Sequence, residues 1–455
     1  MIYLGGVKMD TSALESHQSF PVFAVLDGQR KLPLDRFLSV FADVRAREGA
    51  GALLLAANGF LLLSGYYMLK AVRESLILSQ SGPEGKMYTA AGQALLLLFL
   101  VPAYSAFATR MVRIRLISWV TLFFATHLVI FAALGFQGVR IGVAYFLWLG
   151  ICNYLLIGQF WAFANDLYDE HEGKRLFPLV GGGVALGSLV GAELAAFLFR
   201  AFGPYKLMLL SAVILTASVA PALIVNRHES RTGSPQERIV KARIGGRGGF
   251  QLIRSDRYLF LIAALVLLLN LVNSNGEFIM SKLAAAQAGA AGGNQMQFFG
   301  ELYAHFYGLQ NLIVLILQIF VVSRVFRYIG VRGALFVVPA IAMGGYALAL
   351  ALPILGVVRI VKSLENSTDY SIQSTARQAL FLPTSREAKY KAKMAIDTFF
   401  TRSGDMLSAV LVFVGSRLAF SVQNYAALNL VFVFVWVGLV VAVVRQHKKA
   451  VPSIA

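Results

Sequence analysis

The sequence has little that could crosslink the fold or bind a metal ion. Its 455 residues include a single cysteine, Cys152, which lies in an apolar stretch. One cysteine excludes a disulfide framework and a cysteine-based metal site. The six histidines show no metal-ligand spacing, and no nucleophile stands beside a general base. We therefore expect neither an enzyme nor a bound metal or cofactor.

Charge is also scarce, at 14% of the residues, whereas hydrophobic residues make up 58%. An ordinary soluble protein holds about 45–50% apolar residues. The apolar residues come in long blocks, and about 20 of them make one helical crossing of a bilayer. The sequence thus predicts an all-α membrane protein with about twelve transmembrane helices and the lipid bilayer around it. We place the spans near residues 51–78, 87–110, 114–136, 140–167, 175–200, 205–226, 258–283, 297–323, 331–352, 353–381, 393–417 and 424–444.

Residues 1–50 precede the first apolar block and form a separate, polar N-terminal segment. No secretory signal is recognised before that block, which is itself long enough to span. The apolar residues of the segment that repeat at helical spacing are Leu34, Phe37, Leu38, Phe41 and Val44. This pattern predicts an amphipathic helix on the membrane surface, with a helix docked on the protein as the alternative.

The net charge of +18 is concentrated in alternate connections between the spans. The lysine- and arginine-rich connections are 110–115, 174–175, 227–257, 324–332 and 386–393, and the C-terminal end 445–449 is basic too. Cytoplasmic loops of membrane proteins carry such an excess of positive charge. We therefore place these connections and both termini in the cytoplasm, expect the inner membrane of the cell as the location, and expect no nucleic-acid partner.

The longest and most basic connection, 227–257, divides the spans into two sets of six. Arg110 and Arg113 after span two are echoed by Arg324 and Arg327 after span eight, which indicates a duplicated unit. Two six-helix repeats around a midplane site are typical of major-facilitator transporters. The predicted domains are the segment 1–50, a first bundle 51–226, the linker 227–257, a second bundle 258–447 and a tail 448–455, in a protein that we expect to be monomeric.

Charged and amide residues inside the spans fall mainly on spans one, four, seven and ten, which are equivalent helices of the repeat. Charges in hydrocarbon are costly and normally face a water-filled cavity or each other. We predict that these four spans line a substrate path, and that the substrate-binding or gating residues are Lys70, Arg73, Glu74, Asn153, Trp161, Asn165, Asp166, Asn273, Glu277, Arg359, Lys362, Glu365, Asp369 and Arg377.

In span ten, Arg359, Lys362, Asn366, Asp369, Gln373 and Arg377 step by three or four residues and so share one stripe of the helix. The basic residues of spans one and ten give the proposed path a positive surplus, which suits an anionic substrate. Buried ion pairs that act as gates, such as Lys70–Glu74 or Lys362–Glu365, are the alternative.

A glycine-rich stretch in span five resembles a phosphate-binding loop at first sight. No Lys-Ser or Lys-Thr follows it, and it lies inside an apolar span. Gly183, Gly187 and Gly191 are spaced by four residues, which predicts a face on which another helix packs closely.

Three stretches resemble the plastid and parasite-type ATP/ADP translocases, which are related to the major-facilitator superfamily. The first is Lys70-Ala-Val-Arg73-Glu74; the second runs from Phe160-Trp161 through Asn165-Asp166 to Pro178; the third runs from Tyr370 through Pro383 to Asp397, with Arg402 and Gly404 beyond. Their spacing and span order agree with that family across residues 50–420, so the resemblance extends over most of the chain.

This resemblance implies exchange of ATP for ADP, or transport of a related nucleotide, by alternating access. It implies that Lys70 and Arg73 meet phosphate oxygens and that Asp166 and Glu277 are functional acids, and it adds Asp397, Arg402 and Asp405 to the site. Asp405 stands where well-known exchangers have a lysine, so the sequence resembles a divergent bacterial member, with another organic anion as the alternative substrate. A proton-coupled carrier of an unrelated solute, with Asp369, Glu277 or Glu193 as its proton site, and a membrane adaptor or sensor that does not transport are the other candidates.

Overall fold

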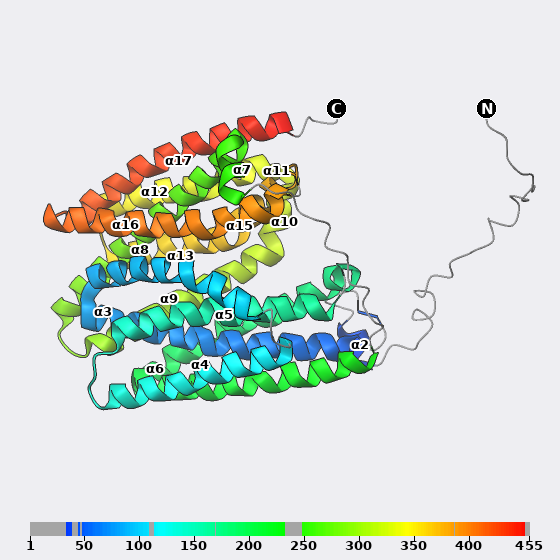
Figure 1. The fold of residues 1–455 in the computed structure, drawn as a ribbon. Coiled ribbons are helices and arrows are strands. Elements are labelled where there is room, and N and C mark those ends of the chain that lie inside the picture. Colours follow the sequence, from blue (N-terminus) through cyan, green and yellow to red (C-terminus); the bar gives the residue numbers. More distant parts are fainter. Residues whose placement is uncertain are drawn as a thin grey trace, which may run out of the picture.

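Helices make up nearly all of the chain that the computed structural model describes (Figure 1). The structure describes residues 33–38, 44–45, 48–108, 113–168, 170–232, 248–385 and 387–450, and within these ranges it has no strand. The helices of the first half are α2 (Pro33–Leu38), α3 (Gly49–Ala108), α4 (Arg113–Phe136), α5 (Gly142–Leu167) and α6 (Glu170–Thr232). Those that follow are α7 (Gly249–Ser255), α8 (Arg257–Ala291), α9 (Gln295–Ile316), η2 (Leu317–Val321), α10 (Val322–Tyr328), α11 (Gly330–Ala334), α12 (Val337–Ala351), α13 (Leu355–Thr368), η3 (Asp369–Gln373), α14 (Ser374–Leu380), η4 (Ala388–Ala392), α15 (Lys393–Ala395), η5 (Ile396–Phe400), α16 (Thr401–Arg417) and α17 (Val422–Ala450), where η marks π-helical turns. The predicted all-α membrane fold is confirmed.

Eight helical stretches of the described chain are long and apolar enough to cross a membrane. Two of them, in α3 and α6, are twice the needed length and are interrupted at Gly82 and Gly203, whose φ angles are 68° and 66°. This left-handed conformation is open to glycine but strained for other residues. Each of these helices therefore holds two of the predicted spans in succession. The total of about twelve spans and the cytoplasmic termini stay predictions.

The buried apolar residues form two clusters, one in each half of the chain. One cluster is drawn almost wholly from residues 38–225 and the other mainly from residues 252–443. In Figure 1, helices α3 to α6 form the lower part of the molecule, and α8, α12, α16 and α17 form the upper part, with α9 between them. The halves touch where α3 packs against α9 and α16, and where α6 packs against α9.

The short helix α2 packs against α3. Leu38 at its end and Val44 beyond it are buried within the cluster of the first half. The side chains of Leu34, Phe37 and Phe41 lie outside the described residues. Whether the rest of the predicted amphipathic segment rests on the membrane surface stays a prediction. Part of the predicted linker 227–257 is helical, since α6 continues to Thr232 and α7 begins at Gly249.

The predicted glycine face of span five is confirmed. A Cβ atom at Gly183 would lie 2.6 Å from the carbonyl oxygen of Ala56, and one at Gly187 or Gly191 would overlap the backbone of Phe60 or Ser64. The three contacts step along α3 by the same four residues, so α3 and α6 meet backbone to backbone. Ser64 Oγ also donates a 3.0 Å hydrogen bond to the Gly187 carbonyl across this contact. The close approach makes the first bundle a well-packed body.

Substitution of Gly187 by alanine should destabilise the protein, because the added methyl group has no room at the α3 contact. We expect a loss of about 1–3 kcal/mol, typical of an overpacked core. Thermal unfolding of purified protein in detergent measures it. The matched control is Gly182→Ala, since a Cβ at Gly182 meets nothing within 4 Å. Equal stability of the two variants would contradict the packing argument.

Candidate functional site

Glu74 of α3 is fully buried and joins several polar groups between the two halves. Arg73 donates from Nε to Glu74 Oε1 at 3.0 Å and also binds it through a terminal guanidinium nitrogen. Lys86 Nζ lies 2.8 Å from Oε2. From the second half, the Tyr307 hydroxyl donates to Oε1 at 3.2 Å. A buried carboxylate is costly without such partners, so the first half supplies the cations that compensate for its burial.

Lys86 connects this carboxylate to helix α8. Its ammonium group lies 3.8 Å from Glu277 Oε2 and donates a 3.3 Å hydrogen bond to Ser281 Oγ. The Ser281 hydroxyl is in turn 2.8 Å from the hydroxyl of Tyr303. Lys86 falls in the connection between the first two predicted spans, and it is not among the predicted site residues. The only signal in the sequence was a lysine in a connection with little other charge, shortly before an apolar block.

Lys70 lies one turn before Glu74 and has no ion-pair partner among the described residues. Its ammonium group lies 3.9 Å from the ring centroid of Tyr307 and 5.2 Å from that of Tyr67. Such cation–π contacts hold a lysine without neutralising it. The alternative Lys70–Glu74 pair is therefore not formed, because Arg73 and Lys86 take up the carboxylate. We call Lys70, Arg73, Glu74, Lys86 and Glu277 the central network.

Cations outnumber carboxylates in the central network. Lys70, Arg73 and Glu277 are half-buried rather than fully enclosed, and Lys70 and Glu277 come from opposite halves of the chain. The Arg73 guanidinium also lies 4.6 Å from the ring centroid of Phe146 on α5. The central network thus carries a positive surplus at the contact between the halves, whereas a surplus along the whole predicted path stays a prediction.

In the second half, the predicted Lys362–Glu365 ion pair is confirmed, with Nζ and Oε2 3.1 Å apart and both side chains buried. Lys362 also donates to the backbone and side-chain oxygens of Asn273, at 3.2 and 3.1 Å. Glu365 accepts a 2.9 Å hydrogen bond from Tyr346. These bonds tie α13 to α8 and α12 inside the second bundle.

The predicted stripe of span ten exists, but its middle is enclosed by the second half. Lys362, Asn366, Asp369 and Gln373 are buried, and Asn366 donates a 3.2 Å hydrogen bond to Gln310 Oε1 of α9. Arg359 and Arg377, at the two ends of the stripe, are half-buried. A place on the substrate path for these residues stays a prediction.

Asp405, the residue that departs from the family pattern, is neutralised by its neighbours. Its Oδ1 accepts a 2.6 Å hydrogen bond from Ser274 of α8, and its Oδ2 lies 3.2 Å from Arg402. The Arg402 guanidinium lies 5.3 Å from the ring centroid of Tyr154 on α5, which gives a further contact between the halves. The acid therefore adds no net negative charge here.

The remaining predicted residues lie at different depths. Asn153 and Trp161 are half-buried along α5, whereas Asn165 and Asp166 are exposed at its end, and Asp397 is exposed in η5. No contact joins Asn165, Asp166 or Asp397 to the central network in the described part of the chain. Their functional roles stay predictions.

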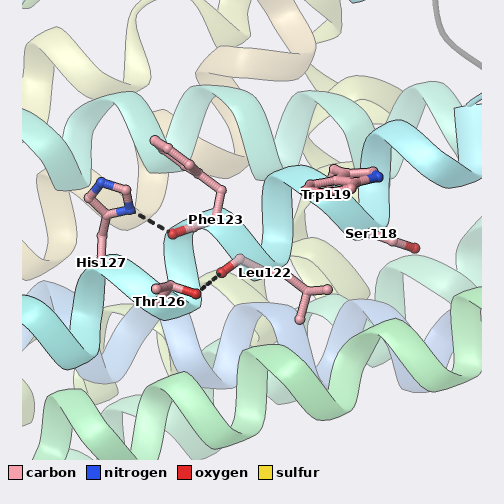
Figure 2. Close-up of a pocket in the computed structure, with 6 residues that line it drawn as sticks. All are labelled: Ser118, Trp119, Leu122, Phe123, Thr126 and His127. Carbon is pink, nitrogen blue, oxygen red and sulfur yellow. Dashed lines mark hydrogen bonds between the residues drawn. The ribbon is translucent and has the colours of Figure 1, made fainter.

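A pocket on the outer face of α4 is unrelated to this site. Figure 2 shows the residues that line it, all from one helix: Ser118, Trp119, Leu122, Phe123, Thr126 and His127. Trp119 is 69% exposed. The His127 ring and the Thr126 hydroxyl bind backbone carbonyls of their own helix, at 2.8 and 2.9 Å, so these polar groups are satisfied locally. This face is that of a lipid-facing span, and it contains none of the predicted site residues.

Comparison with curated proteins finds distant relatives of one kind. The chain is 24% identical to ADP,ATP carrier protein 5 of Rickettsia bellii, with 90% of this chain and 95% of that protein covered. It is 22% identical to ADP,ATP carrier protein 1 of Chlamydia pneumoniae, but this match covers 61% of the chain and only 62% of that protein's length. No family model matches the chain.

Solved structures show the same fold at low sequence identity. A bacterial homologue of the lysosomal transporter Spinster, inward-facing and unoccupied, matches with a TM-score of 0.59 at 12% identity, over 89% of this chain and 98% of that one. A bacterial homologue of the iron transporter ferroportin, also inward-facing, matches with a TM-score of 0.61 at 14% identity, over 88% and 98%. The nucleoside transporter NupG matches with a TM-score of 0.58 at 12% identity, over 88% and 99%. The chain is an integral, multi-pass membrane protein with the fold of these transporters, and it is distantly related to the bacterial ADP,ATP carrier proteins.

Proposed function

We propose that the chain carries a nucleotide, or a closely related phosphorylated organic anion, across the membrane by alternating access. The observation that carries this proposal is Lys70, a half-buried lysine between the two halves whose charge no described acid neutralises. Such a charge is costly inside a membrane protein unless something else binds it. An anionic group of the substrate is the partner that this position favours.

The surroundings of Lys70 favour a phosphate joined to a flat ring system. Arg73 lies within one helical turn and adds a planar set of donors that suits phosphate oxygens. Tyr67 and Tyr307 flank Lys70 with aromatic faces, which can stack against a base after the lysine turns to the phosphate. The ADP,ATP carrier proteins among its relatives support the same substrate class.

Alternating access is supported by where the two halves are bonded. Ser75 donates to the Met296 carbonyl at 2.5 Å, and Lys86 reaches Glu277 and Ser281. These contacts lie near the connections 79–86 and 284–296, which the charge pattern predicts to face the outer side. In this proposal the structure is the inward-facing state, and the outward-facing state forms when the bonds of Lys86 to α8 separate.

The test is a thermal-shift series on the purified chain with ATP, ADP, adenosine, ribose 5-phosphate and a dicarboxylate. We expect ATP or ADP to raise the unfolding temperature, and adenosine, which lacks phosphate, to leave it unchanged. Counterflow in proteoliposomes then shows whether the bound nucleotide is carried. If only the dicarboxylate stabilises the protein, the substrate is another anion and not a nucleotide. If none of the compounds does so, the proposal is wrong.

A further inference from the structure

Asp369 is a buried carboxylate that the proposed nucleotide site does not use. It begins the π-helical turn η3 and is only 6% exposed. Its Oδ1 atom has no hydrogen-bond partner among the described residues. An ionised carboxylate in such a place is costly, so it must be neutralised by a proton or lie beside a cation.

Two amide side chains of the same helical stripe are also buried and also have an oxygen atom without a hydrogen-bond partner in the described part of the chain. Asn366, three residues before Asp369, and Gln373, four residues after it, are both buried and lie on the same face. Asn366 Oδ1 and Gln373 Oε1 are unpartnered within the described chain, while Asn366 uses its amide nitrogen to bond Gln310. One helix face therefore presents a carboxylate and two amide oxygens together.

The charged and titratable groups near Asp369 do not supply a contact cation. Lys362 and Arg377 act on it from its own helix, but Lys362 is already bonded to Glu365 and Asn273, and Arg377 forms no ion pair with a described residue. The other such groups on the elements packed against it are Arg359, Glu365 and Tyr370 on its own helix, Tyr346 on α12, which bonds Glu365, and the exposed Arg324, Arg327 and Tyr328 on α10. Within the described chain, none of them pairs with the carboxylate.

We propose that Asp369, Asn366 and Gln373 form a binding site for a small monovalent cation, a proton or a sodium ion, inside the second bundle. Carboxylate and amide oxygens are ligands that hard cations prefer, and they also accept the hydrogen bond of a protonated carboxyl group. Single π-helical turns inside α-helices are frequent at functional sites, and η3 contributes two of the three residues.

The site is connected to the contact between the halves through the next residue in the chain. Tyr370 is 48% exposed, although Asp369 beside it is buried, so the two side chains leave η3 on different faces. Tyr370 lies close enough to Glu277 and Tyr67 to interact with them electrostatically. In this proposal, occupation of the cation site alters the turn that also carries Tyr370, and this couples transport to a cation gradient.

The experiment uses the purified full chain without substrate, so its outcome does not depend on the nucleotide proposal. Infrared spectra at neutral pH detect a protonated carboxyl group, and thermal unfolding in sodium chloride against choline chloride detects sodium binding. For a proton site, we expect a carboxylic-acid band in the wild type that is lost in Asp369→Asn. For a sodium site, we expect a sodium-dependent rise in unfolding temperature that is lost in the same variant.

Gln373→Met keeps the shape of the side chain but removes its oxygen, and it covers the case in which Asp369→Asn does not fold. It should move the carboxylic-acid band, or raise the sodium concentration needed for half-maximal stabilisation about tenfold. Glu387→Gln, at an acid that pairs with Lys391 on the surface, should change neither signal. A wild type with neither signal, or with signals that persist in Asp369→Asn and Gln373→Met, overturns the proposal.

Discussion

Replacing Lys70 with glutamine should shift the stabilisation of the protein by nucleotide to much higher nucleotide concentrations while leaving the empty protein folded. The lysine has no ion pair to lose among the described residues, so its removal leaves no buried carboxylate behind. The bound phosphate, in contrast, loses a charged donor in a partly desolvated place. Such a loss costs about 2 kcal/mol or more, which corresponds to about a 30-fold weaker affinity. Thermal shift against nucleotide concentration and counterflow in proteoliposomes measure the two effects.

The matched control is Lys448→Gln, which removes the same charge at an exposed position near the end of α17. It should bind and carry the nucleotide as the wild type does. If Lys70→Gln keeps the affinity of the wild type, Lys70 does not contact the phosphate and the proposed site is in the wrong place. If both variants lose affinity equally, the effect is one of net charge and not of position.

Breaking the Lys362–Glu365 pair should produce the largest loss of stability of any single charge removal considered. In Lys362→Met, Glu365 remains buried with only Tyr346 as a partner, and an uncompensated buried charge costs about 3–5 kcal/mol. The double variant Lys362→Met with Glu365→Gln removes both charges, so no unpaired carboxylate stays in the bundle. Most of the lost stability should therefore return. Thermal unfolding in detergent follows all of these variants.

The surface pair Lys391–Glu387 provides the comparison, because both of its side chains are partly exposed. Removing its lysine should change the free energy of unfolding by less than about 1 kcal/mol. A double variant as unstable as Lys362→Met would show that the pair contributes more than the mutual neutralisation of two buried charges.

Several features of the fold could be predicted from the sequence because they depend on local spacing. The glycines of span five recur every four residues, and this alone placed α6 against another helix. Lys362 and Glu365 are three residues apart on one helix, so their pairing followed from helical geometry. The apolar blocks gave the all-α membrane fold, because the length of an apolar block is also a local property of the sequence.

The partners of Glu74 could not be predicted in the same way. Lys70 is at the favourable four-residue spacing, yet Lys86, which follows the chain reversal at Gly82, takes part of the carboxylate instead. Which of two lysines reaches an acid depends on how two helices pack, and that is not encoded in the spacing. For Asp405, in contrast, the spacing would have been enough. Its negative charge, which replaces the lysine of the family, is offset by Arg402 three residues earlier, and this spacing is visible in the sequence.

The distances from Lys86 to Glu74 and to Glu277 indicate where the two halves of the molecule would separate. Its ammonium group is 2.8 Å from Glu74 in its own half but 3.8 Å from Glu277 across the boundary. In the proposed alternating-access cycle, the longer of the two ion-pair distances is the one that crosses the boundary, so Lys86 stays with the first half when the halves move apart. Glu277, whose side chain is already 33% exposed, then loses the ammonium group of Lys86 beside it. The rate at which a carboxyl-modifying reagent labels Glu277 would then measure how often the two halves separate.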